Sequence, residues 1–458
     1  MFTKVLVANR GEIAVRIIRA LREMGIQSVA IYSHADAEAY HTHLADEAVC
    51  VGPGKSLDSY NNMVNVISAA LLTGCQAIHP GYGFLSEKAE FVELCEEVGL
   101  SFIGPSSQVI HLMGHKQNAR ETMAKAGVPI VPGSEGIVST YQEATEVAER
   151  IGFPLMIKAA DGGGGKGMRK VFDAGLLEDA FRQVQAEAQS LYGNQDIYIE
   201  KVIEHASHIE VQLLADHYGN VIHLGERDCS LQRKHQKVIE MAPASNISKD
   251  VRHKMHQVSV KAAKEIGYYN AGTIEYLVDS SGKFYFMEMN TRLQVEHPIT
   301  EMITGVDIVK EQIQIAAGLP LSLSQEKVQF SGFAIECRLN AENPLQNFSP
   351  NAGHIDQLIL PAGGLGVRVE SGIYTHCQIS PYYDSMIAKI ISHDKDEKQA
   401  FDIMQRALFE VVVEGVLTNI DLLEDLIHHP NVLNHQYDTQ WIEREFMPGW
   451  VKEQSKDN

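Results

Sequence analysis

The residues best suited to chemistry stand at every second position of one stretch. These residues are Glu288, Asn290, Arg292, Gln294 and Glu296. Side chains at alternate positions of an extended strand point to the same face, so a straight strand would gather them together. The intervening residues are mostly apolar and would face the core: Met287, Met289, Leu293 and Val295. Carboxylate, amide and guanidinium groups are costly to bury unless they hold ions or substrate, so the stretch predicts a binding face. A solvated strand carrying an Arg–Glu ladder is the alternative.

A hairpin before this stretch predicts a metal site. Residues 273–278 are β-branched and aromatic, as in a strand, and Asp279–Gly282 has the composition of a turn. Folding the chain at this turn brings Glu275 opposite Glu288, to within about one residue of register. Two facing carboxylates repel each other unless a cation lies between them, and carboxylates together with phosphate oxygens are the usual ligands of Mg²⁺.

A glycine run at 161–168 predicts a phosphate-binding loop between two strands, 153–159 and 169–172. No helix follows the run directly, and Lys166 is followed by Gly167 rather than by Ser or Thr, so neither a dinucleotide fold nor a P-loop is supported. Successive glycines can turn their N–H groups toward an anion. The alternative is a plain hairpin loop without a ligand.

Positive charge near such a loop is expected from two places. Lys158 precedes the loop on its strand, and Lys116 is the last residue of a predicted turn at residues 113–116. Five basic residues also lie close together in the sequence: Arg227, Arg233, Lys234, His235 and Lys237. In a chain of formal net charge −20, such a cluster predicts a local field for an anionic substrate. A solvated basic turn is the alternative. Glu200, on a predicted strand at 197–202, could accept a hydrogen bond from an adenine amino group, although such a residue is often only part of a surface pair.

Length and composition limit the class of protein. A chain of 458 residues is too long for one ordinary core, so two or three domains are expected. The net charge argues against a general nucleic-acid surface. The six cysteines are scattered without a Cys-x-x-Cys pair, which indicates a reducing, cytoplasmic setting. No apolar run approaches the roughly 18 residues of a membrane span, and the N-terminus has the pattern of a strand rather than of a signal peptide.

The elements that must position these residues begin with a βαβ unit. Residues 4–8 and 28–32 have the pattern of buried parallel strands, and residues 13–24 have helical apolar spacing that ends at Gly25. This order predicts a doubly wound sheet. The dinucleotide fingerprint is missing after the first strand.

The chain resembles the ATP-grasp superfamily and, within it, the biotin carboxylases, over nearly its whole length. The resemblance rests on Val7–Ala14 (VANRGEIA), His79–Ser86 (HPGYGFLS), Gly162–Met168 (GGGGKGM), Gly225–Lys237 (GERDCSLQRKHQK), Glu288–Pro298 (EMNTRLQVEHP) and Pro381–Ser385 (PYYDS). It implies an α/β fold with a Rossmann-like N-terminal domain (1–114), an ATP-grasp domain (115–330) with a lid at about 131–203 and an α+β C-terminal domain (331–446). A polar tail (447–458) follows, and residues 452–458 are expected to be disordered.

The resemblance also implies roles for individual residues. It assigns ATP binding to Lys116, Lys158, Gly163, Gly164, Gly165, Glu200, Lys201, Ile203, His208, Gln232, His235, Glu275, Leu277 and Glu288. It assigns metal binding to Glu275, Glu288 and Asn290, and bicarbonate binding to Lys237, Arg292, Gln294 and Val295. It assigns catalysis to Arg292, Glu296, Lys237 and Arg338, with Glu296 as the base and Arg338 also contacting biotin. Three positions depart from the usual pattern: His115, Lys234 and Met241.

The implied activity is the ATP- and bicarbonate-dependent carboxylation of biotin with Mg²⁺ or Mn²⁺, two ions being expected. The biotin carrier and the carboxyltransferase are expected to be separate chains, and a homodimer is expected through the helix that holds Arg16, Arg19 and Glu23. A solvated helix face is an equal alternative for that helix. The final acceptor (acetyl-CoA, another acyl-CoA, pyruvate or urea) is left open. Another ATP-grasp ligase, such as a carbamoyl-phosphate or purine-pathway enzyme, and a non-catalytic nucleotide sensor are the competing interpretations; Arg338 and the 288–297 pattern argue against both.

Overall fold

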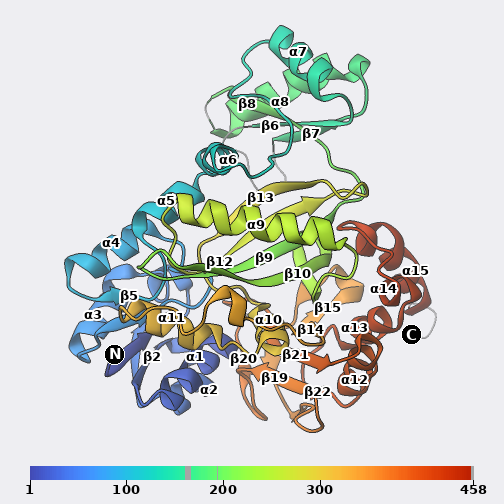
Figure 1. The fold of residues 1–458 in the computed structure, drawn as a ribbon. Coiled ribbons are helices and arrows are strands. Elements are labelled where there is room, and N and C mark those ends of the chain that lie inside the picture. Colours follow the sequence, from blue (N-terminus) through green and yellow to red (C-terminus); the bar gives the residue numbers. More distant parts are fainter. Residues whose placement is uncertain (160–166, 193, 455–458) are drawn as a thin grey trace.

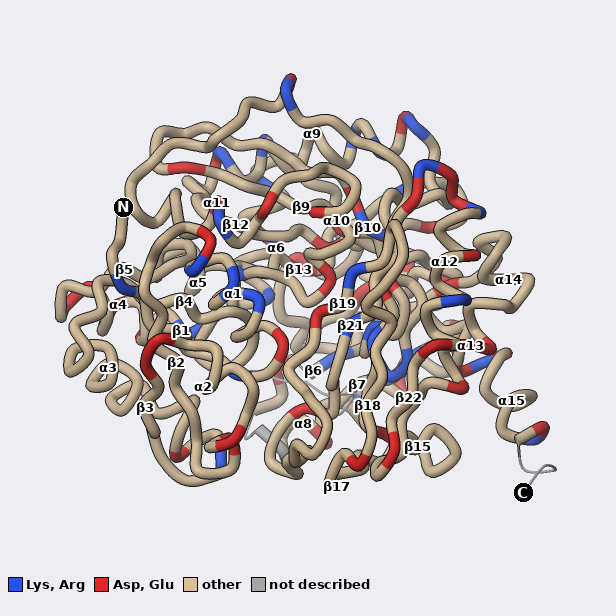
Figure 2. Tube along the Cα trace, turned by 90° about the horizontal axis from the view of Figure 1, so that it is seen from below, with Lys and Arg blue, Asp and Glu red and all other residues tan. Residues whose placement is uncertain are grey.

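The fold is described from a computed structural model of the chain, which covers residues 1–159, 167–192 and 194–454. A parallel sheet with its helices forms one side of the molecule, a long antiparallel sheet runs through the middle, and a small three-stranded sheet with two helices stands apart from both (Figure 1). Lys/Arg and Asp/Glu positions are interspersed along the described trace, so the net charge is not concentrated in one part of it (Figure 2).

The N-terminal region is a five-stranded parallel sheet in the order β3-β2-β1-β4-β5. Its elements are β1 (Lys4–Val7), α1 (Gly11–Glu23), β2 (Gln27–Ser33), α2 (Tyr40–Leu44), β3 (Glu47–Gly52), α3 (Met63–Leu72), β4 (Ala77–His79), α4 (Ala89–Glu97), β5 (Ser101–Phe102) and α5 (Ser107–Gly114). The apolar face of α1 is buried against this sheet through Ile13, Ile17 and Leu21. Gly25 follows α1 with φ +70°, a conformation that glycine adopts without a Cβ penalty. The predicted doubly wound start of an α/β fold is confirmed.

The middle and the C-terminal region share one eight-stranded sheet. The middle contributes α6 (Lys116–Lys125), β9 (Ser207–Ala215), β10 (Val221–Arg233), β11 (Gln236–Ala242), α9 (Lys249–Glu265), β12 (Asn270–Val278), β13 (Phe284–Asn290), α10 (His297–Thr304) and α11 (Ile308–Ala316). The C-terminal region contributes β14 (Phe333–Asn340), β19 (Val367–Ser371) and β21 (Met386–Asp394). The strand order is β13-β12-β9-β10-β11-β14-β21-β19, and α9 lies across β9 and β10 (Figure 1). Because β11 pairs with β14, residues on either side of position 330 can reach one site.

The hairpin of β12 and β13 has the predicted register but not the predicted length. Glu275 lies directly opposite Glu288, and the turn closes where it was expected. The expectation of one straight strand up to Glu296 is wrong: β13 ends at Asn290, and Glu296 is the N-cap of α10. Pro298 accounts for the start of the helix, because proline is favoured in the first helical turn. A register shift next to Glu275 also leaves Met287 exposed rather than in the core.

The small sheet, in the order β7-β6-β8, forms the part that stands apart in Figure 1. Its elements are α7 (Tyr141–Ile151), β6 (Leu155–Ala159), β7 (Met168–Val171), α8 (Leu177–Tyr192) and β8 (Ile197–Lys201). The predicted antiparallel hairpin around the glycine run is confirmed by the pairing of β6 with β7. The run itself, with Gly163, Gly164 and Gly165, lies outside the described residues.

The remaining C-terminal elements pack around β14 and β21. They are β15 (Glu342–Asn343), β16 (Ser349–Pro350), β17 (Gly353–His354), β18 (Gln357–Ile359), β20 (Gln378–Ile379), α12 (Glu397–Phe409), β22 (Val412–Glu414), α13 (Ile420–His428), α14 (Pro430–Leu433) and α15 (Met447–Gln454). The prediction of disorder from Lys452 is wrong for residues 452–454, which belong to α15. The same helix buries Trp450, whose indole Nε1 donates to Asp425 at 2.6 Å. Among the described residues, no helix has the length and apolar character needed to cross a membrane.

Candidate active site

Lys237, on β11, is the centre of the site because it contacts carboxylates from three separate elements. Its ammonium lies 2.7 Å from Glu210 on β9, 3.2 Å from Glu275 on β12 and 2.5 Å from Glu296 at the start of α10. Burial opposes the charge on Lys237, but its acidic neighbours, these carboxylates among them, raise its pKa well above the usual value. The pKa of Glu296 is held well below its usual value despite burial, because Lys237 and Arg338 stabilise the carboxylate.

Arg338 holds the other oxygen of Glu296. Its guanidinium donates to Glu296 Oε2 at 2.9 Å and, through Nε, to Glu240 Oε1 at 2.5 Å. Burial, together with the charge of Glu296, raises the pKa of Glu240 to about 7 even though Arg338 opposes the shift. Glu296 is therefore an ionised carboxylate fixed between an ammonium on one oxygen and a guanidinium on the other.

The residues after β13 form a hydrogen-bonded set although they do not lie on a strand. Arg292 donates to Asn290 Oδ1 at 2.9 Å and to Gln294 Oε1 at 3.1 Å. Both amides donate in turn to Glu275 Oε1, at 2.8 and 2.9 Å. The structure brings these side chains together, although the strand that was expected to align them ends at Asn290.

Two contacts to this segment were missed from the sequence. Glu87 accepts from the Arg292 Nε at 2.9 Å and from the backbone N–H of Thr291 at 3.0 Å. Lys389, which is fully buried on β21, donates to the carbonyl oxygen of Val295 at 2.8 Å. Each left a signal: Glu87 directly follows the HPGYGFLS motif, and Lys389 interrupts the apolar run 387–391 of a predicted buried strand.

Glu275 and Glu288 suit a divalent cation. They face each other across β12 and β13, and the side chain of Glu288 has no hydrogen bond or ion pair to another described residue. Local packing and the charge of Glu275 raise the pKa of Glu288. A cation between the two carboxylates would remove this repulsion, and oxygen donors are the ligands that Mg²⁺ prefers. Asn290 Oδ1 lies in the same set, where it accepts from Arg292.

Several residues assigned to nucleotide binding form hydrogen bonds or ion pairs with one another. Lys158 donates to Glu200 Oε2 at 2.5 Å, and Arg120 donates to Glu200 Oε1 at 3.1 Å. His208 lies 3.0 Å from Glu275, and Gln232 contacts the His208 ring at 3.5 Å. The carboxylate of Glu200 is thus already paired with two cations, which was not expected.

The remaining assigned positions differ in burial and in the element that carries them. Lys201 donates from its ammonium to the carbonyl of Phe153 at 2.6 Å. Ile203 and Leu277 are half-buried, and Lys116 and His235 are exposed. Lys116 is the first residue of α6 rather than part of a turn.

The predicted basic cluster does not form one positive field. Arg227 is fully buried and pairs with Glu210 at 2.5 Å. Arg233 lies 3.8 Å over the ring of Phe348, and Lys234 donates to Asn347 at 3.1 Å. Successive side chains of a strand point to opposite faces, and these basic residues bind separate partners, so sequence proximity overstated the field. Within the cluster, Lys237 is the residue that supplies a cation to Glu275 and Glu296.

The face of α1 that was expected to form a dimer contact makes ion pairs with residues of the same chain. Arg16 is buried and donates to Glu301 at 2.9 Å and to Asp307 at 2.7 Å. Arg19, on the same helix, is about half exposed. A fully solvated helix face is therefore wrong for Arg16.

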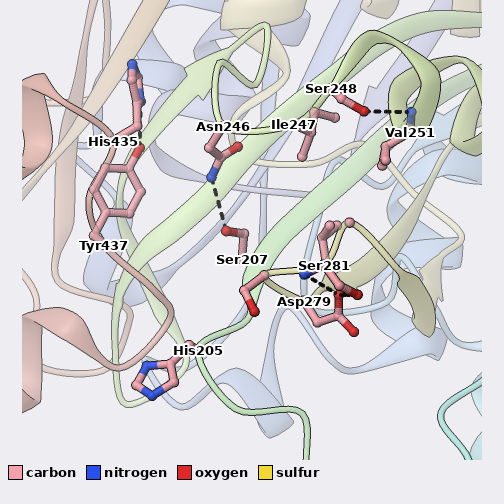
Figure 3. Close-up of a pocket in the computed structure, with 13 residues that line it drawn as sticks. His205, Ser207, Asn246, Ile247, Ser248, Val251, Asp279, Ser281, His435 and Tyr437 are labelled. Carbon is pink, nitrogen blue, oxygen red and sulfur yellow. Dashed lines mark hydrogen bonds between the residues drawn. The ribbon is translucent and has the colours of Figure 1, made fainter.

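A cavity of about 390 Å³ opens beside the turn between β12 and β13 (Figure 3). Its wall includes Asn246, whose amide donates to Ser207, and Ser248, which caps α9 (Figure 3). Its described lining contains no residue that sequence reasoning assigned to the site.

A parallel N-terminal sheet, a small lid-like sheet and facing carboxylates on an antiparallel sheet define an ATP-grasp enzyme. Comparison with known families agrees. The biotin carboxylase N-terminal domain matches residues 1–110, the ATP-binding domain of the carbamoyl-phosphate synthase L chain matches 115–324, and the biotin carboxylase C-terminal domain matches 336–444.

Individual relatives match over nearly the full length. The chain is 54% identical over 444 residues to biotin carboxylase 1 of Bacillus subtilis, covering 97% of this chain and 98% of the relative. It is 50% identical to the 2-oxoglutarate carboxylase small subunit of Hydrogenobacter thermophilus, covering 97% and 93% of the two chains. The biotin carboxylase domain of a thermophilic 2-oxoglutarate carboxylase bound to bicarbonate superposes with a TM-score of 0.93 at 48% identity, covering 97% of this chain and 98% of the other. The chain belongs to the biotin carboxylase family, and the predicted family is confirmed.

Proposed function

We propose that this chain carboxylates biotin, using ATP and bicarbonate, on a separate carrier protein. The observation that carries this proposal is the fixed position of Glu296 between Lys237 and Arg338, next to the Glu275–Glu288 pair. A base lies between two cations there, beside a place for a nucleotide-bound metal. An ATP-dependent activation of one small anion and its transfer to a second substrate need this combination.

The first step activates bicarbonate, which is a poor electrophile. Glu296 accepts the bicarbonate proton, since its carboxylate is ionised at neutral pH. The freed oxygen attacks the γ-phosphorus of ATP, the bond to ADP breaks, and carboxyphosphate forms. Phosphoryl transfer depends mainly on positioning and on cations around the phosphate oxygens. Lys237 and Arg292 orient the anion, while Lys116 and Lys158 approach the phosphates.

Magnesium, held by Glu275, Glu288 and Asn290, would neutralise phosphate charge when bound; Mn²⁺ offers the same chemistry. The proposed nucleotide contacts also include Glu200, Lys201, Ile203, His208, Gln232, His235 and Leu277, with Gly163, Gly164 and Gly165 outside the described residues. For Glu200 to contact adenine, Lys158 must leave it, so the ion pair of 2.5 Å between them would exchange when ATP binds.

The second step uses the products of the first. Carboxyphosphate breaks its bond between carbon and the bridging oxygen to give CO₂ and phosphate. The phosphate takes the proton from the ureido nitrogen of biotin, and that nitrogen bonds to CO₂. Arg338 is placed to stabilise the negative charge that develops on the ureido oxygen. Because carboxyphosphate hydrolyses readily, exclusion of water is required, and closure of the unit formed by residues of about 131–203 would provide it.

We also propose that the domains span residues 1–114, 115–330 and 331–446.

One relative is named as the small subunit of a 2-oxoglutarate carboxylase, and one related structure is the biotin carboxylase subunit of pyruvate carboxylase. Both names support a carrier and a carboxyltransferase on other chains, and a further related structure is described as a dimer. Because these relatives are named for different acceptors, we infer that the acceptor is set by the partner rather than by this site.

The six free cysteines are typical of a reducing compartment, and we place the enzyme in the cytoplasm.

The testing experiment measures ADP release by the purified chain with Mg²⁺ and ATP, with and without bicarbonate and free biotin. The expected result is hydrolysis that requires bicarbonate and rises with biotin. ADP release that is indifferent to bicarbonate would overturn the proposed substrate. Arg252→Met is the control variant and should release ADP as the wild type does. It removes an ion pair with a buried carboxylate, Glu226, but Arg252 is not among the residues assigned to the site.

A further inference from the structure

We propose that Lys389 is a positioning residue that fixes the Gln294–Glu296 turn and links it to the N-terminal region, so that bicarbonate and biotin meet a preformed site. This inference rests on the proposed function. Lys389 touches none of the reacting groups assigned above, and it acts through the backbone of Val295.

The first observation is the location of Lys389. On β21 it pairs in register with Arg338 on β14, and its side chain is fully buried. A lysine is almost never fully buried unless its charge is paired. Its ammonium donates to the carbonyl oxygen of Val295 at 2.8 Å and lies 3.1 Å from Glu12 Oε2. Two cations on neighbouring strands thus contact the same turn, the half-buried Arg338 through Glu296 and the fully buried Lys389 through Val295.

The second observation is what Glu12 contacts. Glu12 stands in the first turn of α1 and accepts a hydrogen bond from the hydroxyl of Tyr82. The loop that carries Tyr82 is itself held by Asn9, whose amide donates to the carbonyls of Pro80 and Tyr82, both at 2.7 Å. Two of the sequence motifs, VANRGEIA and HPGYGFLS, are therefore connected to the Val295 turn through the ammonium of Lys389.

A third observation shows that Glu12 is the balancing charge. Glu336, on β14, is also buried nearby, but neither of its oxygens has a hydrogen-bond partner among the described residues. Burial raises its pKa well above the usual value, although Lys389 opposes the shift. The ammonium of Lys389 instead forms its ion pair with Glu12, at 3.1 Å.

The consequence follows from the position of Val295. Its peptide joins Gln294, which bonds Glu275, to Glu296, which lies between Lys237 and Arg338. A displacement of about 1 Å in a reacting group can cost about a hundredfold in rate. Lys389 holds the carbonyl between these two residues, so its loss should allow both side chains to shift while the nucleotide side stays intact.

The test compares Lys389→Met, Lys389→Arg and the double variant Lys389→Met/Glu12→Gln with the wild type and with the control Arg252→Met. Lys389→Met should raise KM for bicarbonate about tenfold and lower biotin carboxylation relative to bicarbonate-dependent ADP release, while KM for ATP stays within about twofold. Lys389→Arg should recover part of the loss, since it can still donate to the carbonyl. Arg252→Met should leave both KM values unchanged.

The double variant separates positioning from stability. It removes the unpaired charge of Glu12, and the glutamine introduced in its place can still accept from Tyr82, so Tm should recover. KM for bicarbonate should stay raised, because Val295 still lacks its donor. Recovery of KM together with Tm would overturn the inference and leave Lys389 a purely structural residue, as would a KM that never changes. A wild-type chain without bicarbonate-dependent ADP release would instead overturn the proposed function.

Discussion

Lys237 and Glu296 form an ion pair of 2.5 Å at the centre of the site. Lys237 is the residue assigned to hold bicarbonate, and Glu296 is the residue assigned to deprotonate it. The same pattern recurs outside this pair, since Lys158 is bound to Glu200 and Arg338 to Glu240. These cations of the site are bound to the carboxylates of the protein itself. Anionic substrates must therefore take over these cations, which ties substrate binding to rearrangement of the side chains.

Replacing Glu288 with glutamine should lower Mg²⁺-dependent ADP release by about a hundredfold or more without loss of folding. Glu288 is exposed and unpaired among the described residues, and it is repelled by Glu275, so its charge does not support the fold. Steady-state turnover over a range of Mg²⁺ concentrations, together with Tm, checks this. The matched control is Glu265→Gln, an exposed carboxylate at the end of α9. Normal turnover of Glu288→Gln with Mg²⁺ would remove Glu288 from the metal site.

Replacing Arg338 with alanine should abolish biotin carboxylation but preserve slow bicarbonate-dependent ATP hydrolysis, because Arg338 is assigned to the anion of biotin. Loss of one partner of a buried ion pair costs roughly 3 kcal/mol. The pKa of Glu240 is already raised to about 7, so this carboxyl group can take up a proton when the guanidinium is removed, which limits the cost. Parallel assays of ADP release and of carboxybiotin formation decide the matter. Equal loss of both activities would place Arg338 in the first step.

Stability should fall in mild acid because of a buried histidine far from the site. Burial lowers the pKa of His41 from 6.5 to about 4, so the folded state keeps this ring neutral while the unfolded state protonates it. The unfolded state binds more protons between these values, and stability rises with pH there and is lost as pH falls from about 6.5 to about 4. The full contribution is roughly 3 kcal/mol.

Urea unfolding of the wild type and of His41→Gln from pH 4 to pH 7 measures this effect. The glutamine variant should have a lower free energy of unfolding at pH 7 but a smaller dependence on pH. An unchanged slope in the variant would assign the acid sensitivity to other histidines whose pKa burial lowers, such as His223, to about 4, and His79, to about 3.

Local sequence patterns predicted most of the strands and helices near the site, whereas several side-chain contacts depend on how those elements pack against one another. The facing of Glu275 and Glu288 followed from strand alternation and one turn. The end of β13 at Asn290 was missed because apolar alternation continues past it, although Pro298 signals a helix start. Arg227 pairs with Glu210 on the neighbouring strand, which the run of basic residues alone did not indicate. The contact of Lys389 with Val295 joins segments that are distant in sequence. The periodicity of apolar and polar residues along the sequence does not predict such contacts.

Replacing Glu87 with glutamine should raise KM for bicarbonate severalfold while KM for ATP changes little. Glu87 fixes Arg292 through its Nε at 2.9 Å and also accepts from the N–H of Thr291 at 3.0 Å. A charged hydrogen bond is roughly twice as strong as a neutral one, so glutamine keeps the backbone contact but loosens the guanidinium. Glu87→Ala should have a larger effect, because both contacts are lost. Glu87 is about two-fifths exposed, so neither change should lower Tm appreciably. Bicarbonate titrations of ADP release at saturating ATP test this order of effects, and equal KM values in wild type, Glu87→Gln and Glu87→Ala would show that Arg292 keeps its orientation without Glu87.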